Sequence, residues 1–335
     1  MTAAQFYLDF KNKLKSIYDD REVENISDWI FERVTNLKKW ERRADPDKEM
    51  PSAAASQLKK YLEELLQHKP VQYVLNEAWF YKRKFYVDEH VLIPRPETEE
   101  LVEWIINDFR LNKALNICEA NAKVSPVDRD TGHGSVAPAT SAAANSDPAL
   151  PPTGMHNKPL TTQLQIIDIG TGSGCIPVSL KKELPEAGIS AIDVSETALH
   201  IAQKNSETLN TEINLLRIDF LNENEWGSLQ KYDIIVSNPP YIPAKEKEGL
   251  ARNVTDFEPA IALFVPGDNS LLFYEKIAAF ARSHLNEQGK IYVEVHENYA
   301  KNVKLVFEKS GFISTIKKDL YGKERMVKAE LPSNF

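Results

Sequence analysis

The stretch that decides the fold is Gln165–Ile176, with the sequence QIIDIGTGSGCI. Its first half is a short apolar run typical of a buried strand, and Gly170, Gly172 and Gly174 then alternate with small residues. Glycine permits positive φ and lets the backbone approach a ligand closely, and the start of a following helix offers free N–H groups. Pro177 fits the first turn of that helix. The stretch predicts a strand, a ligand-binding turn and a helix.

The spacing of the glycines separates two kinds of cofactor loop. The dinucleotide fingerprint Gly-x-Gly-x-x-Gly fails in both registers, because its last glycine would fall on Cys175 or Pro177. The pattern Asp-x-Gly-x-Gly-x-Gly fits, and it is similar to the S-adenosylmethionine loop of Rossmann-like methyltransferases. The cofactor-binding residues predicted from this loop are Asp168, Gly170, Thr171, Gly172, Ser173 and Gly174.

Acidic residues stand at the ends of the next two predicted strands. Asp193 ends the run Ser190–Asp193, and its carboxylate can accept hydrogen bonds from both ribose hydroxyls of an adenosyl group. Asp219 and Phe220 follow the third strand, Asn214–Ile218. The carboxylate there can accept from the adenine amino group, and the ring or the adjacent N–H can cover the base. If these residues do not bind a ligand, Asp193 is simply a neighbour of a helix cap, and Asp219 and Phe220 belong to an ordinary loop.

The fourth strand lies in Tyr232–Ile242, YDIIVSNPPYI, and its two prolines end it because neither can donate to a sheet ladder. Asn238, two backbone carbonyls and the ring of Tyr241 therefore crowd the carboxyl end of the strand, where open α/β sheets bind ligands. The group offers no strong nucleophile and no metal ligand. It is suited to holding a flat NH2 group, such as a carboxamide or an aminated base. Four such strand-helix steps indicate a doubly wound α/β sheet.

The rest of the chain divides by composition. Phe6, Phe10 and Leu14 recur at helical spacing, and Ser27 and Ser56 are the expected starts of a second and a third helix. A β-hairpin is expected between Trp79 and Ile93, followed by a stiff proline joint into a helix. A long stretch rich in Ala, Ser, Pro and Thr has too few apolar residues to fold. The expected segments are a helical docking domain (1–75), a hairpin and linker helix (76–117), a disordered insertion (118–162) and the cofactor domain (163–335).

Charge and cysteine content limit the class of protein. The 335 residues carry a net charge of −8, which argues against a bulk electrostatic hold on nucleic acid. Cys118 and Cys175 cannot form a disulfide framework, which fits a reducing compartment. The first residues lack a signal-peptide pattern and no apolar run approaches a membrane span. We expect a cytoplasmic protein without a membrane partner; the sequence leaves its oligomeric state open.

The order of these motifs resembles the release-factor glutamine N5-methyltransferase family. The matching segments are Val71–Tyr73, Leu92–Glu99, Asp168–Gly174, Asn238–Ile242, Glu258–Pro259 and the residues Asp319, Gly322 and Arg325. The resemblance implies a Rossmann-like class I methyltransferase sheet with a small N-terminal helical domain and a linking β-hairpin. It also implies S-adenosylmethionine as cofactor and methylation of the glutamine of the Gly-Gly-Gln tripeptide in class I peptide-chain release factors. The helical domain would help to hold that large substrate.

The site chemistry follows as a hypothesis. Asn238 Oδ1 and the Pro239 carbonyl would accept the two N–H bonds of the glutamine amide, and Tyr241 would stack on its plane. The expected catalytic residues are therefore Asn238, Pro239 and Tyr241, without a metal. Pro240 joins these three in the expected substrate-binding set, and Asn238 also counts among the cofactor-binding residues. Arg95 is either a solvated surface charge or a residue that reaches the cofactor site.

Two alternatives and two departures accompany this resemblance. An adenine N6-methyltransferase acting on DNA or RNA shares the Asn-Pro-Pro-Tyr motif, but it would need a flipped base and a basic track. A non-catalytic adaptor would have no use for the intact loop. Asn76 and Lys82 occupy positions where the family usually has glycine, so the first is a mild change and the second is expected to alter the hairpin turn.

Overall fold

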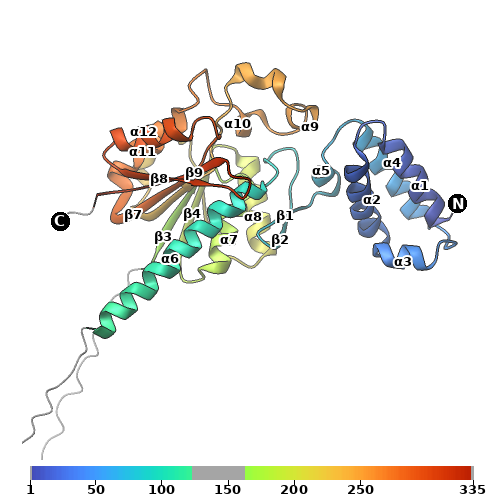
Figure 1. The fold of residues 1–335 in the computed structure, drawn as a ribbon, viewed down its shortest axis with the longest axis horizontal. Coiled ribbons are helices and arrows are strands. Elements are labelled where there is room, and N and C mark those ends of the chain that lie inside the picture. The colour runs from blue at the N-terminus through green and yellow to red at the C-terminus, as the bar shows by residue number, and fades with distance from the viewer. Residues whose placement is uncertain (1, 123–162, 333–335) are drawn as a thin grey trace, which may run out of the picture. The chain divides into compact units, whose positions relative to one another are not determined.

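A seven-stranded sheet forms the centre of this computed structural model, which describes residues 2–122 and 163–332 (Figure 1). The strand order is β5-β4-β3-β6-β7-β9-β8. The strands are β3 (Gln165–Ile169), β4 (Gly188–Asp193), β5 (Asn214–Arg217), β6 (Tyr232–Ser237), β7 (Leu285–Glu294), β8 (Ile313–Lys318) and β9 (Glu324–Glu330). β3 to β7 pair in parallel, whereas β9 is antiparallel to both β7 and β8. The predicted α/β class and the four predicted strands are confirmed.

The order of the strands reverses at β3. The chain moves to one side of β3 to add β4 and β5, and then returns to the other side to add β6 and β7. The connections leave β3 and β6 in opposite directions, which opens a crevice outside the carboxyl ends of the strands. The glycine loop after β3 and the Asn-Pro-Pro segment after β6 meet at that crevice, because Ile169 and Ser237 are partners in the sheet.

Helices bury both faces of the sheet. α7 (Cys175–Glu183) and α8 (Glu196–Thr208) contact each other and the strands β3 to β5, and Ser195 caps α8 by accepting from the Ala198 N–H. α11 (Leu272–His284) and α12 (Ala300–Lys309) pack in one core cluster with Ile167, Ile235 and Ile291. Burial of these β-branched side chains is the main stabilising term of the sheet, at roughly 1.5–3 kcal/mol for each fully buried side chain.

The N-terminal residues form a helical bundle with a core of its own. Its helices are α1 (Ala3–Leu14), α2 (Asp20–Thr35), α3 (Lys39–Ala44), α4 (Ser52–Leu66) and α5 (Val71–Leu75). Phe10, Leu14 and Phe31 are fully buried there, and the rings of the two phenylalanines meet edge to face with their centroids 5.3 Å apart. The bundle was predicted with three helices, and the structure adds α3 and α5.

Two predicted helix starts in this bundle are wrong. α2 begins after Asp19, whose carboxylate accepts from the backbone N–H groups of Arg21 and Glu22, and Ser27 lies buried inside the helix. An ionised carboxylate at the N-terminus also interacts favourably with the helix dipole, so Asp19 is the better cap. α4 begins at Ser52 and therefore already includes Ser56. A serine that precedes apolar residues did not mark the start of either helix, because small residues are tolerated inside both.

Residues 2–106 and 164–332 belong to one compact unit, and residues 107–122 belong to a second. α6 (Pro96–Ala122) begins in the first unit, and its last residues include the start of the predicted insertion over 118–162. The remainder of that insertion lies outside the described residues. Within the described range, no helix is long and apolar enough to span a membrane.

Two elements in the C-terminal half differ from what their local sequence indicates. The apolar pattern of a strand starts at Lys290 and Gly289 favours a helix end, but β7 already begins at Leu285, which pairs with Tyr232 beyond a bulge, and Gly289 lies inside it. Pairing with β6 extends β7 through a segment whose local pattern favoured the end of a helix. The segment Thr255–Leu263, whose sequence indicates a loop, contains α10 (Ala260–Leu263) and the end of α9 (Arg252–Thr255).

A short hairpin links the bundle to the sheet, as predicted. β1 (Ala78–Phe80) pairs with β2 (Arg83–Phe85), and Tyr81 and Lys82 make the two-residue turn with φ of 45° and 65°. Two positive φ angles define a type I′ turn, which matches the twist of a hairpin but favours glycine. Asn76 also has a positive φ of 51°, and its side chain donates to the Val87 carbonyl at 3.0 Å.

Replacing Lys82 by glycine is expected to stabilise the protein by about 0.5–1 kcal/mol, because the strain of a left-handed side chain exceeds the extra entropy of the unfolded glycine. Urea unfolding of the wild type and of Lys82→Gly measures the difference. Lys84→Gly is the matched control, since Lys84 lies in β2 and pairs with Glu77, and it should destabilise. A destabilised Lys82→Gly would show that the turn is not strained.

Candidate functional site

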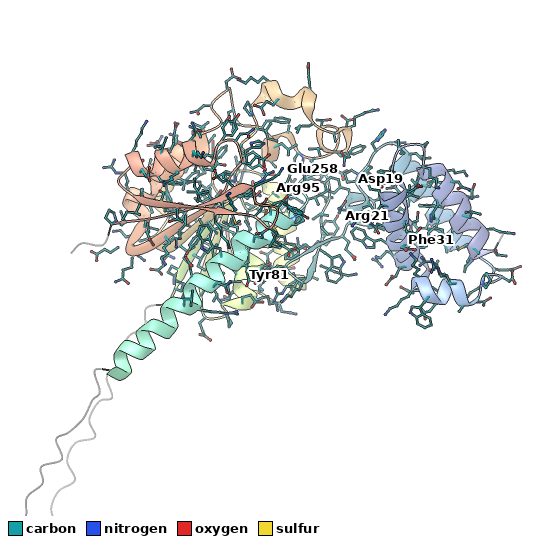
Figure 2. All side chains as sticks on the ribbon, viewed as in Figure 1. Asp19, Arg21, Phe31, Tyr81, Arg95 and Glu258 are labelled. Atoms are coloured by element: carbon teal, nitrogen blue, oxygen red, sulfur yellow. The ribbon has the colours of Figure 1, made fainter. Side chains whose placement is uncertain are left out.

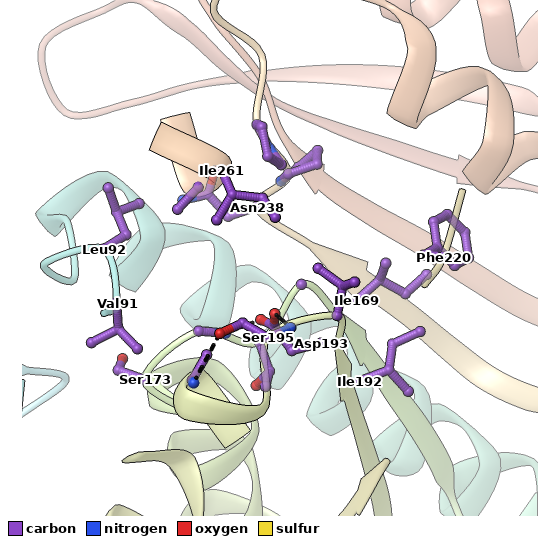
Figure 3. Close-up of a pocket in the computed structure, with 18 of the residues that line it drawn as sticks. Val91, Leu92, Ile169, Ser173, Ile192, Asp193, Ser195, Phe220, Asn238 and Ile261 are labelled. Carbon is purple, nitrogen blue, oxygen red and sulfur yellow. Dashed lines mark hydrogen bonds between the residues drawn. The ribbon is translucent and has the colours of Figure 1, made fainter. Parts of the chain in front are cut away.

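A cavity of about 320 Å³ lies at the carboxyl ends of β3, β4 and β6 (Figure 3). Most of the site residues predicted from the sequence line it, namely Gly170, Thr171, Gly172, Ser173, Asp193, Asp219, Phe220, Asn238, Pro239 and Pro240. Figure 3 shows Asn238 and Ile261 on one side of the cavity, with Ser173, Asp193 and Ser195 on the opposite side. Asp168 and Gly174 lie behind this lining, and Tyr241 borders a different cavity.

The three glycines of the loop serve two different purposes. Gly170 and Gly172 have φ of 74° and 53°, and no atom lies within 4 Å of the position that a Cβ would take. Their side toward the cavity is therefore open to a ligand. Gly174 has φ of 76°, and a Cβ there would come within 3.0 Å of the Ala202 Cβ on α8. Gly174 thus allows α7 and α8 to pack closely.

Asp168 is a buried carboxyl behind the loop. Its two oxygens and the Thr171 hydroxyl are buried and have no hydrogen-bond partner among the described residues. Burial raises the pKa of the Asp168 carboxyl to about 7; the nearby Thr171 hydroxyl opposes the rise, and the charge of Asp193 adds to it. A buried polar atom without a partner is costly, and such atoms gather where a ligand supplies the missing donor.

Asp193 fixes the loop and still has capacity for a ligand. Its Oδ2 accepts from the Gly172 N–H and its Oδ1 accepts from the Ser195 N–H, each at 2.9 Å. A carboxylate has about four lone-pair sites, so two remain for hydroxyl donors in the cavity. Burial raises the pKa of this carboxyl, and the bonds from the backbone N–H groups oppose the rise.

Asp219 and Phe220 form the far wall of the cavity. Asp219 is exposed and its side chain accepts from the Leu221 N–H at 3.0 Å. Phe220 is buried, and one face of its ring stacks on Trp226 with centroids 5.4 Å apart. The ring also meets that of Phe280 edge to face, with centroids 5.6 Å apart. This packing holds the ring rigidly at the cavity wall.

Asn238 is held by two residues that the sequence did not single out for this role. Its Nδ2 donates to Thr98 Oγ1 at 3.1 Å, and the Thr98 hydroxyl donates to Glu294 Oε2 at 2.5 Å. Thr98 comes from α6 and Glu294 ends β7, and both are buried. The preceding Ser237 donates to the Ile169 carbonyl at 2.7 Å, which ties the end of β6 to the start of the glycine loop.

Tyr241 follows the two prolines but borders a second cavity of about 340 Å³. Its ring centroid lies 5.8 Å from that of His296, which in turn lies 5.5 Å from that of Tyr299. Glu246 and Leu250 also line this second cavity. The structure therefore places Asn238, Pro239 and Pro240 in one cavity and the Tyr241 ring in the neighbouring one.

Arg95 lies at the first cavity and not in bulk solvent. It lines the cavity, and its Nη2 donates to both carboxylate oxygens of Glu258, at 2.7 and 2.8 Å (Figure 2). Burial raises the pKa of the Glu258 carboxyl, and the Arg95 charge opposes the rise. The ion pair joins the proline joint before α6 to the segment that leads into α10. No cluster of His, Cys, Asp or Glu able to hold a metal ion occurs among residues 2–122 and 163–332.

Comparison with known proteins gives two domain matches and several relatives. Residues 154–256 match the model of the methyltransferase small domain, and residues 7–75 match that of the PrmC N-terminal domain. The release factor glutamine methyltransferase of Flavobacterium psychrophilum is 37% identical over 98% of this chain and 99% of its own. The proteins of the same name from Bacteroides thetaiotaomicron and Streptococcus pneumoniae are 33% and 32% identical, over 95% and 98% of this chain and 96% and 98% of theirs.

Ligand-free protein is expected to lose stability as the pH rises through the pKa of Asp168. A carboxyl whose pKa is raised from 3.8 to about 7 by folding contributes stability below its unfolded pKa and loses it as the pH passes 7. Asp168→Asn does not titrate. The fall in unfolding free energy between pH 5 and pH 8 should therefore be smaller in Asp168→Asn by about 1–3 kcal/mol, as measured by urea titration.

Asp219→Asn serves as the control, because Asp219 is exposed. Its fall in unfolding free energy should match that of the wild type. An equal fall in Asp168→Asn would mean that the Asp168 carboxyl is not the titrating group.

Proposed function

The chain belongs to the release factor glutamine methyltransferase family, and on that premise we propose that it methylates the side-chain amide of a release-factor glutamine with S-adenosylmethionine. The substrate glutamine is that of the Gly-Gly-Gln tripeptide in class I peptide-chain release factors. One observation carries the proposal: a single cavity is lined by the glycine loop, by Asp193 and by Asn238. The donor and the acceptor of a methyl group can therefore meet there.

The residues of the cavity fit S-adenosylmethionine. The volume of about 320 Å³ lies within the range of small-molecule pockets, and the open side of Gly170 and Gly172 admits a ligand against the backbone. Asp193 would accept from the ribose hydroxyls, and Asp219 and Phe220 would hold the adenine. The Thr171 hydroxyl, which lines the cavity, lacks a hydrogen-bond partner that a ligand can supply. When bound, S-adenosylmethionine supplies an electrophilic methyl group on a positively charged sulfur.

The substrate amide needs help to react, because the lone pair of its nitrogen is delocalised into the carbonyl. Asn238 Oδ1 and the Pro239 carbonyl would accept its two N–H bonds, which raises the electron density on nitrogen and fixes the plane of the amide. Pro239 and Pro240 lack an N–H, so neither backbone competes as a donor at this edge. Val91, Leu92 and Ile261 add apolar side chains to the lining of the cavity (Figure 3).

Tyr241 has a different place in this proposal from the one expected. Because its ring borders the second cavity, stacking on the glutamine amide would require the ring to turn toward the first. We therefore assign Tyr241 to contact with the chain that flanks the glutamine. The N-terminal bundle, which matches the PrmC N-terminal domain over residues 7–75, is the proposed docking domain for the release factor.

The adenine alternative lacks comparable support. The relatives are named for glutamine methylation of release factors, and the net charge of −8 is unsuited to a nucleic acid track. Incubation with labelled S-adenosylmethionine and either a release factor or a nucleic acid compares the two substrates directly. Label should enter the release factor and not the nucleic acid.

Asn238→Ala is expected to lower kcat at least about 100-fold, because it removes an acceptor that acts on the reacting nitrogen. Mass spectrometry of a release factor incubated with the enzyme and S-adenosylmethionine measures the gain of one methyl on the tripeptide glutamine. The dissociation constant of the cofactor should change less than about threefold. Asn302→Ala, at an exposed position of α12, should behave as wild type. Substantial methyl transfer by Asn238→Ala would remove Asn238 from the proposed role.

Asp193→Ala is expected to weaken cofactor binding at least about tenfold, since each hydrogen bond to a charged group contributes about 1.5–3 kcal/mol. Isothermal titration with S-adenosylhomocysteine measures the dissociation constant. The exposed Glu196→Ala, three residues further along the chain, controls for the change in charge and should bind normally. Unchanged affinity in Asp193→Ala would place the ribose elsewhere.

A further inference from the structure

We propose that Thr98 and Glu294 are positioning residues that set the polarity of the Asn238 carboxamide, so that its oxygen and not its NH2 group faces the substrate. This inference rests on the proposed function, in which Asn238 Oδ1 accepts from the substrate amide. It assigns a role at this site to two buried residues, Thr98 of α6 and Glu294 of β7.

The need for such a device follows from the shape of asparagine. The oxygen and the NH2 group of a carboxamide have nearly the same size, so packing alone does not choose between the two orientations. The two orientations have opposite chemistry at this site. One presents an acceptor to the N–H of the substrate, and the other presents a second donor that repels it.

The hydrogen-bond chain makes this choice. An ionised carboxylate only accepts, so the single proton of the Thr98 hydroxyl must be donated to Glu294, as the 2.5 Å contact indicates. Thr98 Oγ1 can then only accept from Asn238, which requires Nδ2 to face Thr98, as observed at 3.1 Å. Asn238 Oδ1 is consequently turned away from Thr98. Burial of Thr98 and Glu294, which are 2% exposed each, keeps water from satisfying either group instead.

Protonation of Glu294 would reverse the direction of the hydrogen bonds in this chain. A protonated carboxyl can donate to Thr98 Oγ1, which frees the Thr98 hydroxyl to donate to Asn238 Oδ1 and turns the amide around. Burial raises the pKa of the Glu294 carboxyl to about 7, so this reversal falls in an accessible pH range. The charged and titratable groups that act on Glu294 or are affected by it come from every neighbouring element, and they are Arg95, Glu97, Cys175, Tyr241, Tyr274 and Arg325.

The effects of these neighbours can be ordered. Glu97 raises the pKa of Glu294 further, whereas the hydrogen bond from Thr98 and the charges of Arg325 and Arg95 lower it. The net direction is upward because burial is the largest cause. Methyl transfer at saturating cofactor should therefore rise with pH through about 7, as Glu294 ionises and the amide takes its productive orientation.

A purely structural role makes different predictions. If the contact only tied α6 to β7, loss of the Thr98 hydroxyl would change the melting temperature but not the pH profile of turnover. The test therefore measures kcat for a release factor from pH 6 to pH 9, together with KM, the dissociation constant of S-adenosylhomocysteine and thermal unfolding. The variants are Thr98→Ser, Thr98→Val and Glu294→Gln. The control is Glu287→Gln, which removes an exposed carboxylate from the same strand.

Thr98→Ser should keep at least about half of the wild-type kcat, because it retains the hydroxyl. Thr98→Val should lower kcat about 10- to 100-fold, with little change in the affinity for cofactor. In Glu294→Gln the amide can either donate to Thr98 or accept from it, so kcat should fall about five- to tenfold at pH 8. That variant should also lose the ionisation limb, which is the rise of kcat with pH near 7. Glu287→Gln should retain both the rate and the limb.

An unchanged ionisation limb in a folded Glu294→Gln, or a wild-type kcat in Thr98→Val, would overturn the inference while the wild type still methylates glutamine. If Thr98→Val or Glu294→Gln unfolds, the inference is decided by Thr98→Ser and by the orientation of the Asn238 amide in the wild type. Neutron diffraction or NMR assigns that orientation. An Nδ2 turned away from Thr98 at pH 8 would overturn it. A wild type that transfers no methyl to a release-factor glutamine would overturn the proposed function, and this inference with it.

Discussion

The site depends on the pairing of β3 with β6, which joins the two segments that carry its chemistry. Ile169 and Ser237 are sheet partners, and the Ser237 hydroxyl donates to the Ile169 carbonyl at 2.7 Å. The glycine loop starts one residue after Ile169, and Asn238 comes one residue after Ser237. Because the connections leave these strands in opposite directions, the crevice between them stays open for a ligand. The distance between the two halves of the reaction is thus fixed by backbone hydrogen bonds in the sheet.

Burial gives this site its electrostatic character. Asp168 and Glu294 are both buried carboxyls near the carboxyl ends of β3 and β7, the two strands that flank β6, and burial raises the pKa of each to about 7. They have different surroundings, since Glu294 accepts from Thr98 whereas the Asp168 oxygens have no partner among the described residues. We infer that Glu294 orients a neighbouring side chain, whereas Asp168 lies behind the lining of the cofactor cavity. Perturbed carboxyls of this kind concentrate at functional sites.

The parts of the site that the sequence revealed are those in which chemistry follows directly from chain order. In a parallel sheet the carboxyl ends of neighbouring strands meet, so Asp193 and Asn238 could be placed near the glycine loop from their positions after apolar runs. Thr98 and Glu294 could not be connected in this way, because 196 residues separate them and no local pattern marks their contact. The direction of the Tyr241 ring depends on His296, which belongs to a later segment. The early start of β7 likewise depends on its pairing with Tyr232.

The central claim is that Asn238 presents its oxygen to a glutamine amide beside a bound methyl donor. The most direct measurement is a crystal structure of this protein with S-adenosylhomocysteine and a release-factor fragment that contains the Gly-Gly-Gln tripeptide. We predict that Asn238 Oδ1 lies at hydrogen-bond distance, about 2.9 Å, from the glutamine nitrogen, which faces the sulfur of the cofactor. A glutamine side chain bound away from Asn238, or a cofactor bound outside the cavity of the glycine loop, would contradict the account.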